Sequence, residues 1–170
     1  MNLRHAAARQ KPSFAEIQND SRVLDALAEY APLLPSDKES AILDIGFGGG
    51  WFLAACLTLG YTNLSGADFG IENKRYIADW KEGAVTLHQI ETDIGTFLSH
   101  RPEQYDFIHM SHVIEHIPKY SLFWVVDALY QSLNRGGILL LRTPNMEGPT
   151  PNSSLYVTLG HEYGFCPSAV

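Results

Sequence analysis

Residues 41–53, AILDIGFGGGWFL, decide the fold of this chain. A short and mostly apolar run, residues 42–45, leads into a glycine-rich turn, and a second apolar run follows over residues 51–59. Strand, glycine turn and helix in this order are typical of the first βα unit of a doubly wound sheet, where ligands bind at the carboxyl ends of the strands. Glycines at 46, 48, 49 and 50 lack the Cβ atoms that would keep a ligand away from the backbone.

The spacing of these glycines indicates which class of ligand the turn could bind. The dinucleotide fingerprint G-x-G-x-x-G, counted from Gly46 and Gly48, needs a third glycine at position 51, which is Trp51. A phosphate-binding loop needs Gly-Lys-Ser/Thr, and residues 41–53 contain no lysine. The pattern therefore favours a ligand without phosphates, such as an adenosyl amino acid. A glycine turn that only reverses the chain is the structural alternative.

Composition narrows the class of protein. A chain of 170 residues with 45% hydrophobic content is expected to form one ordinary domain. The formal net charge of −7, with lysines and arginines scattered singly, argues against nucleic acid as a partner. Cys56 and Cys166 form no metal or redox motif, and no apolar run has the length of a membrane span. These features predict a cytoplasmic protein.

Helix-like and strand-like patterns alternate along the chain. The expected strands are residues 42–45, 64–67, 85–90, 105–110 and 138–141, and the expected helices are residues 14–34, 51–59, 71–80, 94–100 and 123–133. This alternation implies a parallel sheet with right-handed crossovers. Arg135-Gly136-Gly137 is expected to end the preceding helix, and the unbroken apolar run 138–141 is expected to be buried on both faces.

An acidic residue follows the second expected strand. Asp68 lies 22 residues after Gly46, where a carboxylate can accept hydrogen bonds from both ribose hydroxyls of a nucleoside. Phe69 and Ile71 beside it offer an apolar wall for an adenine. The alternative is an Asp in a solvated loop. Asp93 precedes the expected helix 94–100, where Asp is a preferred N-cap.

Three motifs in colinear order carry a family resemblance. Asp44-x-Gly46-x-Gly48-x-Gly50 resembles motif I of the class I S-adenosylmethionine-dependent methyltransferases. Residues 111–118, SHVIEHIP, resemble the segment after the fourth strand of the small-molecule members of that family. Gly-Gly before the fifth strand and Thr-Pro-Asn after it are family features as well. The resemblance covers roughly residues 41–145.

The resemblance implies a fold and a division of the chain. The fold is α/β, a Rossmann-like three-layer αβα sandwich with a mostly parallel doubly wound sheet in strand order 3-2-1-4-5. Residues 1–40 would form an N-terminal arm and cover helix, 41–145 the S-adenosylmethionine-binding domain, and 146–170 an irregular segment near the substrate side. The usual C-terminal strands are expected to be missing or irregular. The open fifth strand would then contact a second copy or more of a longer parent chain.

The resemblance also implies which residues bind the cofactor. The amino-acid moiety of S-adenosylmethionine would lie near the start of motif I, the ribose at Asp68, and the sulfonium above Ser111 and His112. Adenine would lie at Asp93 and Ile94, with the N-cap role of Asp93 as an equal alternative. The full expected set is Asp44, Gly46, Phe47, Gly48, Asp68, Phe69, Asp93, Ile94 and Ser111.

Methyl transfer needs mainly alignment of the acceptor with the sulfonium, and an oxygen acceptor also needs a general base. The candidates are His112, Glu115 and His116, which would share one face of a helix; contacts or caps are the structural alternative for the last two. In some quinone-biosynthetic methyltransferases an acid, a Glu and a His at this spacing hold a divalent metal. His112 replaces the first acid here, so no metal is predicted. By resemblance, His161 lies on the substrate side, whereas His109 is expected to be an ordinary core or surface residue.

The function predicted from the sequence is S-adenosylmethionine-dependent methyl transfer to a small-molecule acceptor, with S-adenosylhomocysteine as product. The acceptor would be a sugar, a lipid, a quinone or a secondary metabolite. An NAD-dependent oxidoreductase or epimerase is disfavoured by Trp51 and by the lack of a Tyr-x-x-x-Lys pair. A methyltransferase-like scaffold domain of a larger protein is favoured by the short C-terminus and disfavoured by Asp68 and Asp93.

Overall fold

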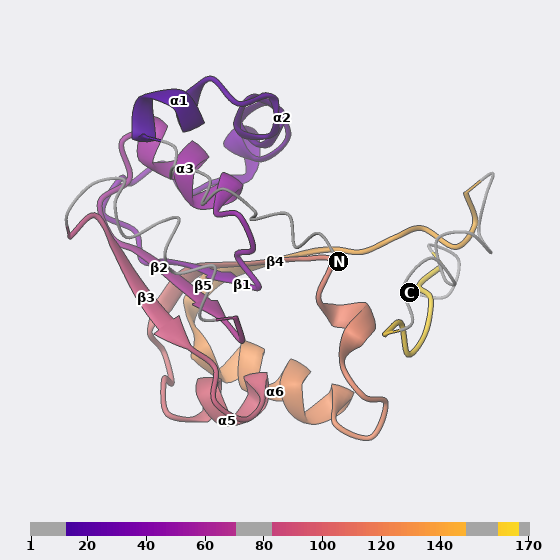
Figure 1. Cartoon of the computed structure of the whole chain (residues 1–170). Helices are drawn as coiled ribbons and strands as arrows, with labels where there is room; N and C mark the ends of the chain where they lie inside the picture. Colours follow the sequence, from indigo (N-terminus) through magenta and orange to yellow (C-terminus); the bar gives the residue numbers. More distant parts are fainter. Residues whose placement is uncertain (1–12, 71–82, 149–159, 167–170) are drawn as a thin grey trace, which may run out of the picture.

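A computed structural model of the chain describes residues 13–70, 83–148 and 160–166 (Figure 1). Its centre is a five-stranded sheet in the order β3-β2-β1-β4-β5, in which every neighbouring pair is parallel. This confirms the predicted strand order. The helix expected at 71–80 lies outside the described residues. The strands are β1 Ile42–Ile45, β2 Leu64–Asp68, β3 Val85–Gln89, β4 Tyr105–Ser111 and β5 Leu133–Arg142.

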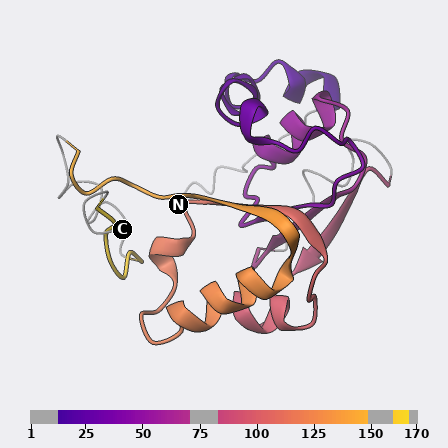
Figure 2. The same ribbon diagram turned by 180° about the vertical axis from the view of Figure 1, so that it is seen from behind.

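Helices cover both faces of the sheet and make three layers (Figures 1 and 2). One face carries α1, α2 and α3, and the opposite face carries α5 and α6. Their bounds are α1 Phe14–Gln18, α2 Ser21–Tyr30, α3 Trp51–Thr58, α5 Ile94–Ser99 and α6 Leu122–Ser132, with the 3-10 turns η1 Ala31–Leu33 and η2 Ile114–His116 between them. Two apolar clusters form the core, one on each face of the sheet.

The middle strand β1 is buried along its whole length, because helices cover both of its faces. Ile42 and Phe107 face the layer of α2 and α3, whereas Leu43 and Ile45 face the layer of α5 and α6. Parallel strands end at the same edge of a sheet, so the glycine turn after β1 lies beside the carboxyl ends of β2 and β4. The backbone N–H of Gly46 donates to the carbonyl of Ala67, at 2.7 Å, and so fixes the start of this turn.

The prediction of a single helix over residues 14–34 is wrong, because the helix is interrupted at Asn19 and Asp20. Asn19 is the C-cap of α1, and Asp20 is the N-cap of α2, where its carboxylate accepts from the backbone N–H of Arg22 at 2.9 Å. The apolar spacing runs through both helices and conceals the break. A capping aspartate competes well with continued helix because it satisfies a backbone donor.

The fifth strand corrects two predictions. Helix α6 already ends at Ser132, so Gly136 does not terminate it as predicted. Gly136 has a φ of 82° and lies in an irregular part of β5, where the pairing with β4 shifts register. The apolar run is also not buried on both faces, since Ile138 is 46% and Leu141 is 38% exposed. Within the described part of the chain, no strand pairs with the outer edge of β5.

The described C-terminal residues, 160–166, pack beside η2 rather than on the sheet. The backbone N–H of Glu162 donates to the carbonyl of Glu115 at 2.8 Å, and the Tyr163 hydroxyl donates to the carbonyl of Ile114 at 3.1 Å. A single bridge joins Asn145 and Phe165. In the described part of the chain, the helices are all too short or too polar to cross a membrane.

Candidate active site

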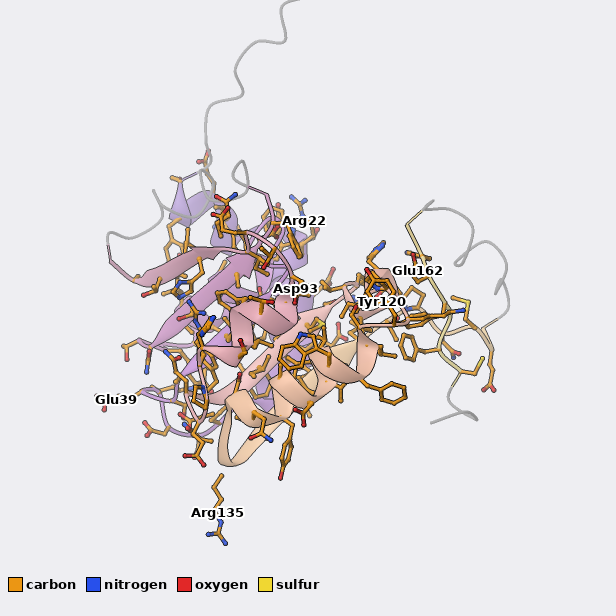
Figure 3. All side chains as sticks on the ribbon, turned by 90° about the horizontal axis from the view of Figure 1, so that it is seen from below. Arg22, Glu39, Asp93, Tyr120, Arg135 and Glu162 are labelled. Carbon is orange, nitrogen blue, oxygen red and sulfur yellow. The ribbon has the colours of Figure 1, made fainter. Side chains whose placement is uncertain are left out.

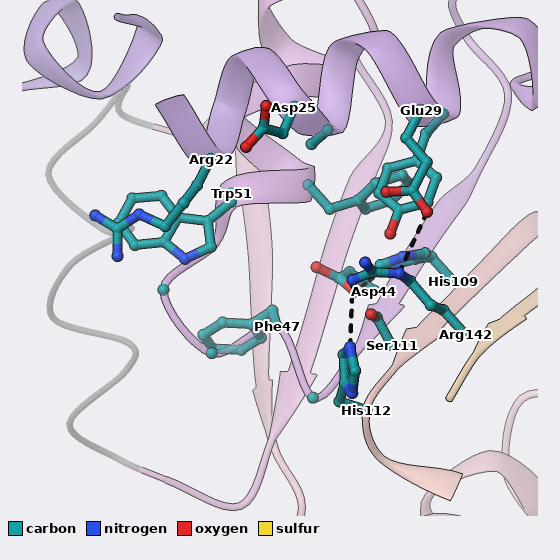
Figure 4. Close-up of a pocket in the computed structure, with 16 residues that line it drawn as sticks. Arg22, Asp25, Glu29, Asp44, Phe47, Trp51, His109, Ser111, His112 and Arg142 are labelled. Atoms are coloured by element: carbon teal, nitrogen blue, oxygen red, sulfur yellow. Dashed lines mark hydrogen bonds and ion pairs between the residues drawn. The ribbon is translucent and has the colours of Figure 1, made fainter. Parts of the chain in front are cut away.

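A cavity of about 400 Å³ opens at the carboxyl ends of β1 and β4 (Figure 4). Its walls are α2, the glycine turn, the start of α3 and the last residues of β4 and β5. Six of the residues singled out from the sequence line it together: Asp44, Gly46, Phe47, Gly48, Ser111 and His112. The predicted cofactor edge of the sheet is therefore hollow.

Gly46 and Gly48 are two of the three glycines in this turn whose positive φ other residues rarely adopt. Gly46 has a φ of 72° and Gly48 a φ of 49°. A Cβ on Gly46 would also lie 2.3 Å from Cγ2 of Val113, so this position has no room for a side chain. Both constraints select glycine.

Asp68 connects the end of β2 to the glycine turn. Its Oδ2 accepts from the backbone N–H of Gly48 at 3.1 Å, and its Oδ1 accepts from the backbone N–H of Gly70 at 2.9 Å. A carboxylate has about four acceptor sites, so two remain for ribose hydroxyls. The side chain is partly exposed at the edge where the sequence expects a ribose.

A second cavity of about 110 Å³ collects the residues expected at the adenine. Phe69, Asp93 and Ile94 line it, and Val113 and Ile117 complete its apolar wall. Val113 also contacts the position of Gly46, so the two cavities lie on either side of this contact. The walls suit a flat, weakly polar ring.

Asp93 is the N-cap of α5. It accepts from the backbone N–H of Thr96 at 2.8 Å and from the Thr96 hydroxyl at 2.7 Å. The backbone hydrogen bond from Thr96, followed by that of its hydroxyl, holds the pKa of the Asp93 carboxyl below its usual value. The capping alternative is therefore realised, while the contact with adenine stays a prediction.

A buried ion pair between β1 and β4 was not predicted from the sequence. Asp44 Oδ1 lies 2.7 Å from His109 Nδ1, and both side chains are almost fully buried. His109 stacks on Phe52, with ring centroids 4.0 Å apart, and meets the edge of Tyr30 at 4.9 Å. Burial raises the pKa of the Asp44 carboxyl, and the charge and hydrogen bond of His109 oppose this rise. The residues are register partners, so strand pairing could have revealed them.

Arg142, at the end of β5, connects α2 to His112 (Figure 4). Its Nε lies 3.3 Å from Oε1 of Glu29, and its Nη1 lies 3.2 Å from Nε2 of His112. Arginine only donates, so Nε2 of His112 accepts and the ring proton is on Nδ1. Arg142 thus occupies Nε2 of His112, which is the ring nitrogen that would have to accept a proton in catalysis. His112 also has a φ of 56°, a strained conformation for a residue other than glycine.

The other two candidates for the base do not share a helical face with His112, because residues 114–116 form a 3-10 turn. Glu115 points inward and is 1% exposed, whereas His116 lies at the surface and lines the second cavity. His161 joins them from the C-terminal segment, with its ring centroid 4.7 Å from that of His116. The structure therefore brings Glu115, His116 and His161 together.

Helix α2 contributes more to the large cavity than a cover helix would. Arg22, Asp25 and Glu29 line it from one face of the helix, together with Tyr30. The guanidinium of Arg22 stacks over the Trp51 ring, 3.6 Å from its centroid. The sequence does contain a signal for this role, because Arg22, Asp25 and Glu29 stand at positions i, i+3 and i+7 and therefore share one face of the helix.

Comparisons with known proteins agree with this geometry. A family model described as a methyltransferase domain matches residues 14–167. The ubiquinone biosynthesis O-methyltransferase of Pseudomonas savastanoi is 29% identical over 131 residues, which are 72% of this chain and 50% of that protein. The chain thus spans about half the length of the curated relatives it matches.

Solved structures have the same fold at low identity. A SAM dependent methyltransferase from Archaeoglobus fulgidus has a TM-score of 0.71 at 24% identity, covering 92% of this chain and 68% of that one. Coclaurine N-methyltransferase, solved with N-methylheliamine and SAH, has a TM-score of 0.58 at 20% identity, covering 75% of this chain and 43% of that one. With the family match, the chain belongs to the methyltransferase domain family.

Proposed function

We propose that this chain transfers the methyl group of S-adenosylmethionine to a small-molecule acceptor and releases S-adenosylhomocysteine. The observation that carries the proposal is the placement of three carboxylates. Asp44, Asp68 and Asp93 lie at or just after the ends of three neighbouring strands. Asp44 lines the large cavity and Asp93 the smaller one, and Asp68 accepts from the Gly48 backbone N–H in the glycine turn. This edge offers acceptors for an ammonium, for ribose hydroxyls and for an adenine amino group.

The proposed roles follow from position. Asp44 would accept from the ammonium of the amino-acid moiety, and Asp68 would accept from the ribose. Phe69, Ile94 and Val113 would enclose the adenine in the smaller cavity. When bound, the cofactor supplies an electrophilic methyl group, so the protein mainly has to align the acceptor and exclude water.

For an oxygen acceptor, His112 is the proposed base, because it lines the large cavity beside Ser111. Glu115 Oε1 lies 3.4 Å from Nδ1 of His112, on the side where the ring carries its proton. Glu115 would therefore orient the ring and stabilise its charged form. Since Arg142 occupies Nε2, proton transfer to His112 requires Arg142 to move toward the acceptor or toward Glu29.

An aromatic hydroxyl is the acceptor class with the most support. Tyr30 and Trp51 supply aromatic walls to the large cavity. The curated relatives carry the name ubiquinone biosynthesis O-methyltransferase, which fits the quinone option among the predicted acceptors. The proposal also includes a cytoplasmic location and a contact of the β5 edge with a second copy or with more of a longer chain.

Turnover tests this function directly. We expect purified protein to form S-adenosylhomocysteine from S-adenosylmethionine only when a catechol-type or phenolic acceptor is added. His112→Gln should lower kcat about 100-fold or more and change cofactor affinity little, because a general base acts in the transition state. His100→Gln, at an exposed position outside both cavities, is the matched control. Cofactor binding without turnover over a wide acceptor panel would favour the scaffold alternative instead.

A further inference from the structure

Glu115, His116 and His161 form a cluster of potential metal ligands, and of these only Glu115 has a role in the proposed methyl transfer, through its contact with His112. One oxygen or nitrogen atom from each residue lies within 4.8 Å of those of the other two. The first two residues belong to η2, and His161 belongs to the segment 160–166 (Figure 3, where the neighbouring Glu162 is labelled). Residues 45 positions apart in the sequence thus point at one location.

The Glu115 carboxylate has no adequate partner. The residue is 1% exposed, and neither carboxylate oxygen has a hydrogen-bond partner among the described residues. His112 Nδ1 is 3.4 Å from one oxygen, too far for a good hydrogen bond. Burial of a carboxylate without a partner is unfavourable. A cation bound to this carboxylate would offset that cost.

His116 is oriented in the way that metal-ligating histidines usually are. Nδ1 of His116 lies 2.9 Å from the carbonyl oxygen of Gly160, which can only accept. His116 therefore carries its proton on Nδ1 and has a lone pair on Nε2, and such a second contact is the common way to orient a ligating histidine. Nδ1 of His161 is buried and has no hydrogen-bond partner among the described residues.

We propose that Glu115, His116 and His161 bind one divalent transition metal, with Zn²⁺ as the best fit. Two imidazoles and one carboxylate favour zinc and its transition-metal neighbours over Mg²⁺ or Ca²⁺, which take oxygen ligands. Ligand atoms around a tetrahedral zinc lie roughly 3.4 Å apart, given bonds of about 2.0–2.1 Å. The ligand atoms lie within 4.8 Å of one another, so metal binding requires them to approach by at most about 1.4 Å.

These three ligands differ from residues 112, 115 and 116, which have the spacing of the metal ligands in some quinone-biosynthetic methyltransferases. His112 bonds to Arg142 through Nε2, and its place is taken by His161 from another segment. The metal would thus cross-link the C-terminal segment to η2, adding to the hydrogen bond between Glu162 N–H and the Glu115 carbonyl. Because His116 also lines the smaller cavity, the cross-link would fix one wall of that cavity.

The inference does not depend on methyl transfer, and calorimetry with the metal alone tests it. Protein freed of metal with a chelator should bind one equivalent of Zn²⁺, and bound Co²⁺ should show the visible bands of a four- or five-coordinate site. His161→Ala and Glu115→Gln should each weaken binding at least about tenfold. His112→Ala should bind as tightly as the parent, and so should the surface control His100→Ala.

A second readout follows the segment itself. Zinc should slow hydrogen exchange of the Glu162 backbone N–H in the parent and leave it unchanged in His161→Ala. Unfolding curves without metal establish that the variants are folded. Absence of stoichiometric binding in the parent, equal affinity in His161→Ala, or loss of the site in His112→Ala would each overturn the proposal. Binding of S-adenosylhomocysteine by metal-free His161→Ala would separate this result from the proposed function.

Discussion

Asp44 and His109 form a buried ion pair across β1 and β4, with 2.7 Å between Oδ1 of Asp44 and Nδ1 of His109. The pair lies beside the glycine turn and lines the large cavity. Packing of Phe52 and Tyr30 against His109 fixes the ring, and the ring in turn fixes the carboxylate. The acidic residue of the turn motif therefore has a defined orientation before any ligand binds.

Asp44→Asn should lose less stability than the parent protein does between pH 4 and pH 7, while its cofactor affinity falls. Burial raises the pKa of the Asp44 carboxyl, so the folded state binds this proton more tightly than the unfolded state does. The carboxyl's contribution to stability is full below its ordinary pKa and is lost as the pH rises through the raised pKa. Asn keeps the shape without the charge. Denaturant unfolding at pH 4 and pH 7 measures the effect, and equal changes of stability in the parent and in Asp44→Asn between these pH values would contradict it.

Cofactor binding should release a proton. An ammonium beside Asp44 would favour its charged form and lower the raised pKa toward the ordinary one. Calorimetric titration of S-adenosylhomocysteine in buffers with different ionisation enthalpies measures the proton count. Release should be seen between the ordinary and the raised pKa, and it should decline at higher pH. Proton uptake over this range would be inconsistent with an ammonium at Asp44.

Gly46→Ala should destabilise the protein by about 3 kcal/mol, from the cost of a left-handed residue plus overpacking against Val113. Gly60→Ala is the matched control, because Gly60 also has a positive φ, of 87°, but nothing lies within 4 Å of its Cβ position. That variant should lose only about 1–2 kcal/mol. Chemical denaturation gives both values, and equal losses would show that the contact with Val113 contributes nothing.

Asp20→Ala should cost about 1 kcal/mol at pH 7, because it removes the N-cap of α2. Asp20→Asn, which can still cap, should lose less. Hydrogen bonds from the Arg22 side chain and backbone lower the pKa of Asp20 to about 2. Its contribution is therefore present above the ordinary value of 3.8 and is lost as the pH falls toward 2. A difference between parent and Asp20→Ala that is as large at pH 2 as at pH 7 would rule out the charged cap.

The sequence predicted most of the fold because its signals are local. Buried strands such as β1 and β4 are apolar runs ended by turn residues, and Gly46 marks the ligand edge directly. The exposed face of β5 could not be predicted, since exposure depends on which elements cover a strand and not on its own residues. The break at Asn19 and Asp20 was hidden by a continuous helical period.

The site residues that belong to local sequence motifs were predicted. Those that join the site only through contacts between distant segments were not. Asp44, Gly46 and Ser111 follow from the order of elements, and the structure brings them to one cavity. The role of His109 can be recognised only from the strand register that places it beside Asp44. His161 reaches Glu115 only through the packing of segment 160–166 on η2, which no pattern in the sequence encodes.

Calorimetric titration with S-adenosylhomocysteine, beside NAD, tests the central claim most directly. We predict micromolar binding of S-adenosylhomocysteine, about 8 kcal/mol, and no binding of NAD. Asp68→Ala should lose about 2–4 kcal/mol of this free energy, as expected for hydrogen bonds to a charged acceptor, while Asp37→Ala, at an exposed turn, should bind as the parent does. Heat from NAD but not from S-adenosylhomocysteine, or equal affinity in the folded Asp68→Ala variant, would contradict the account.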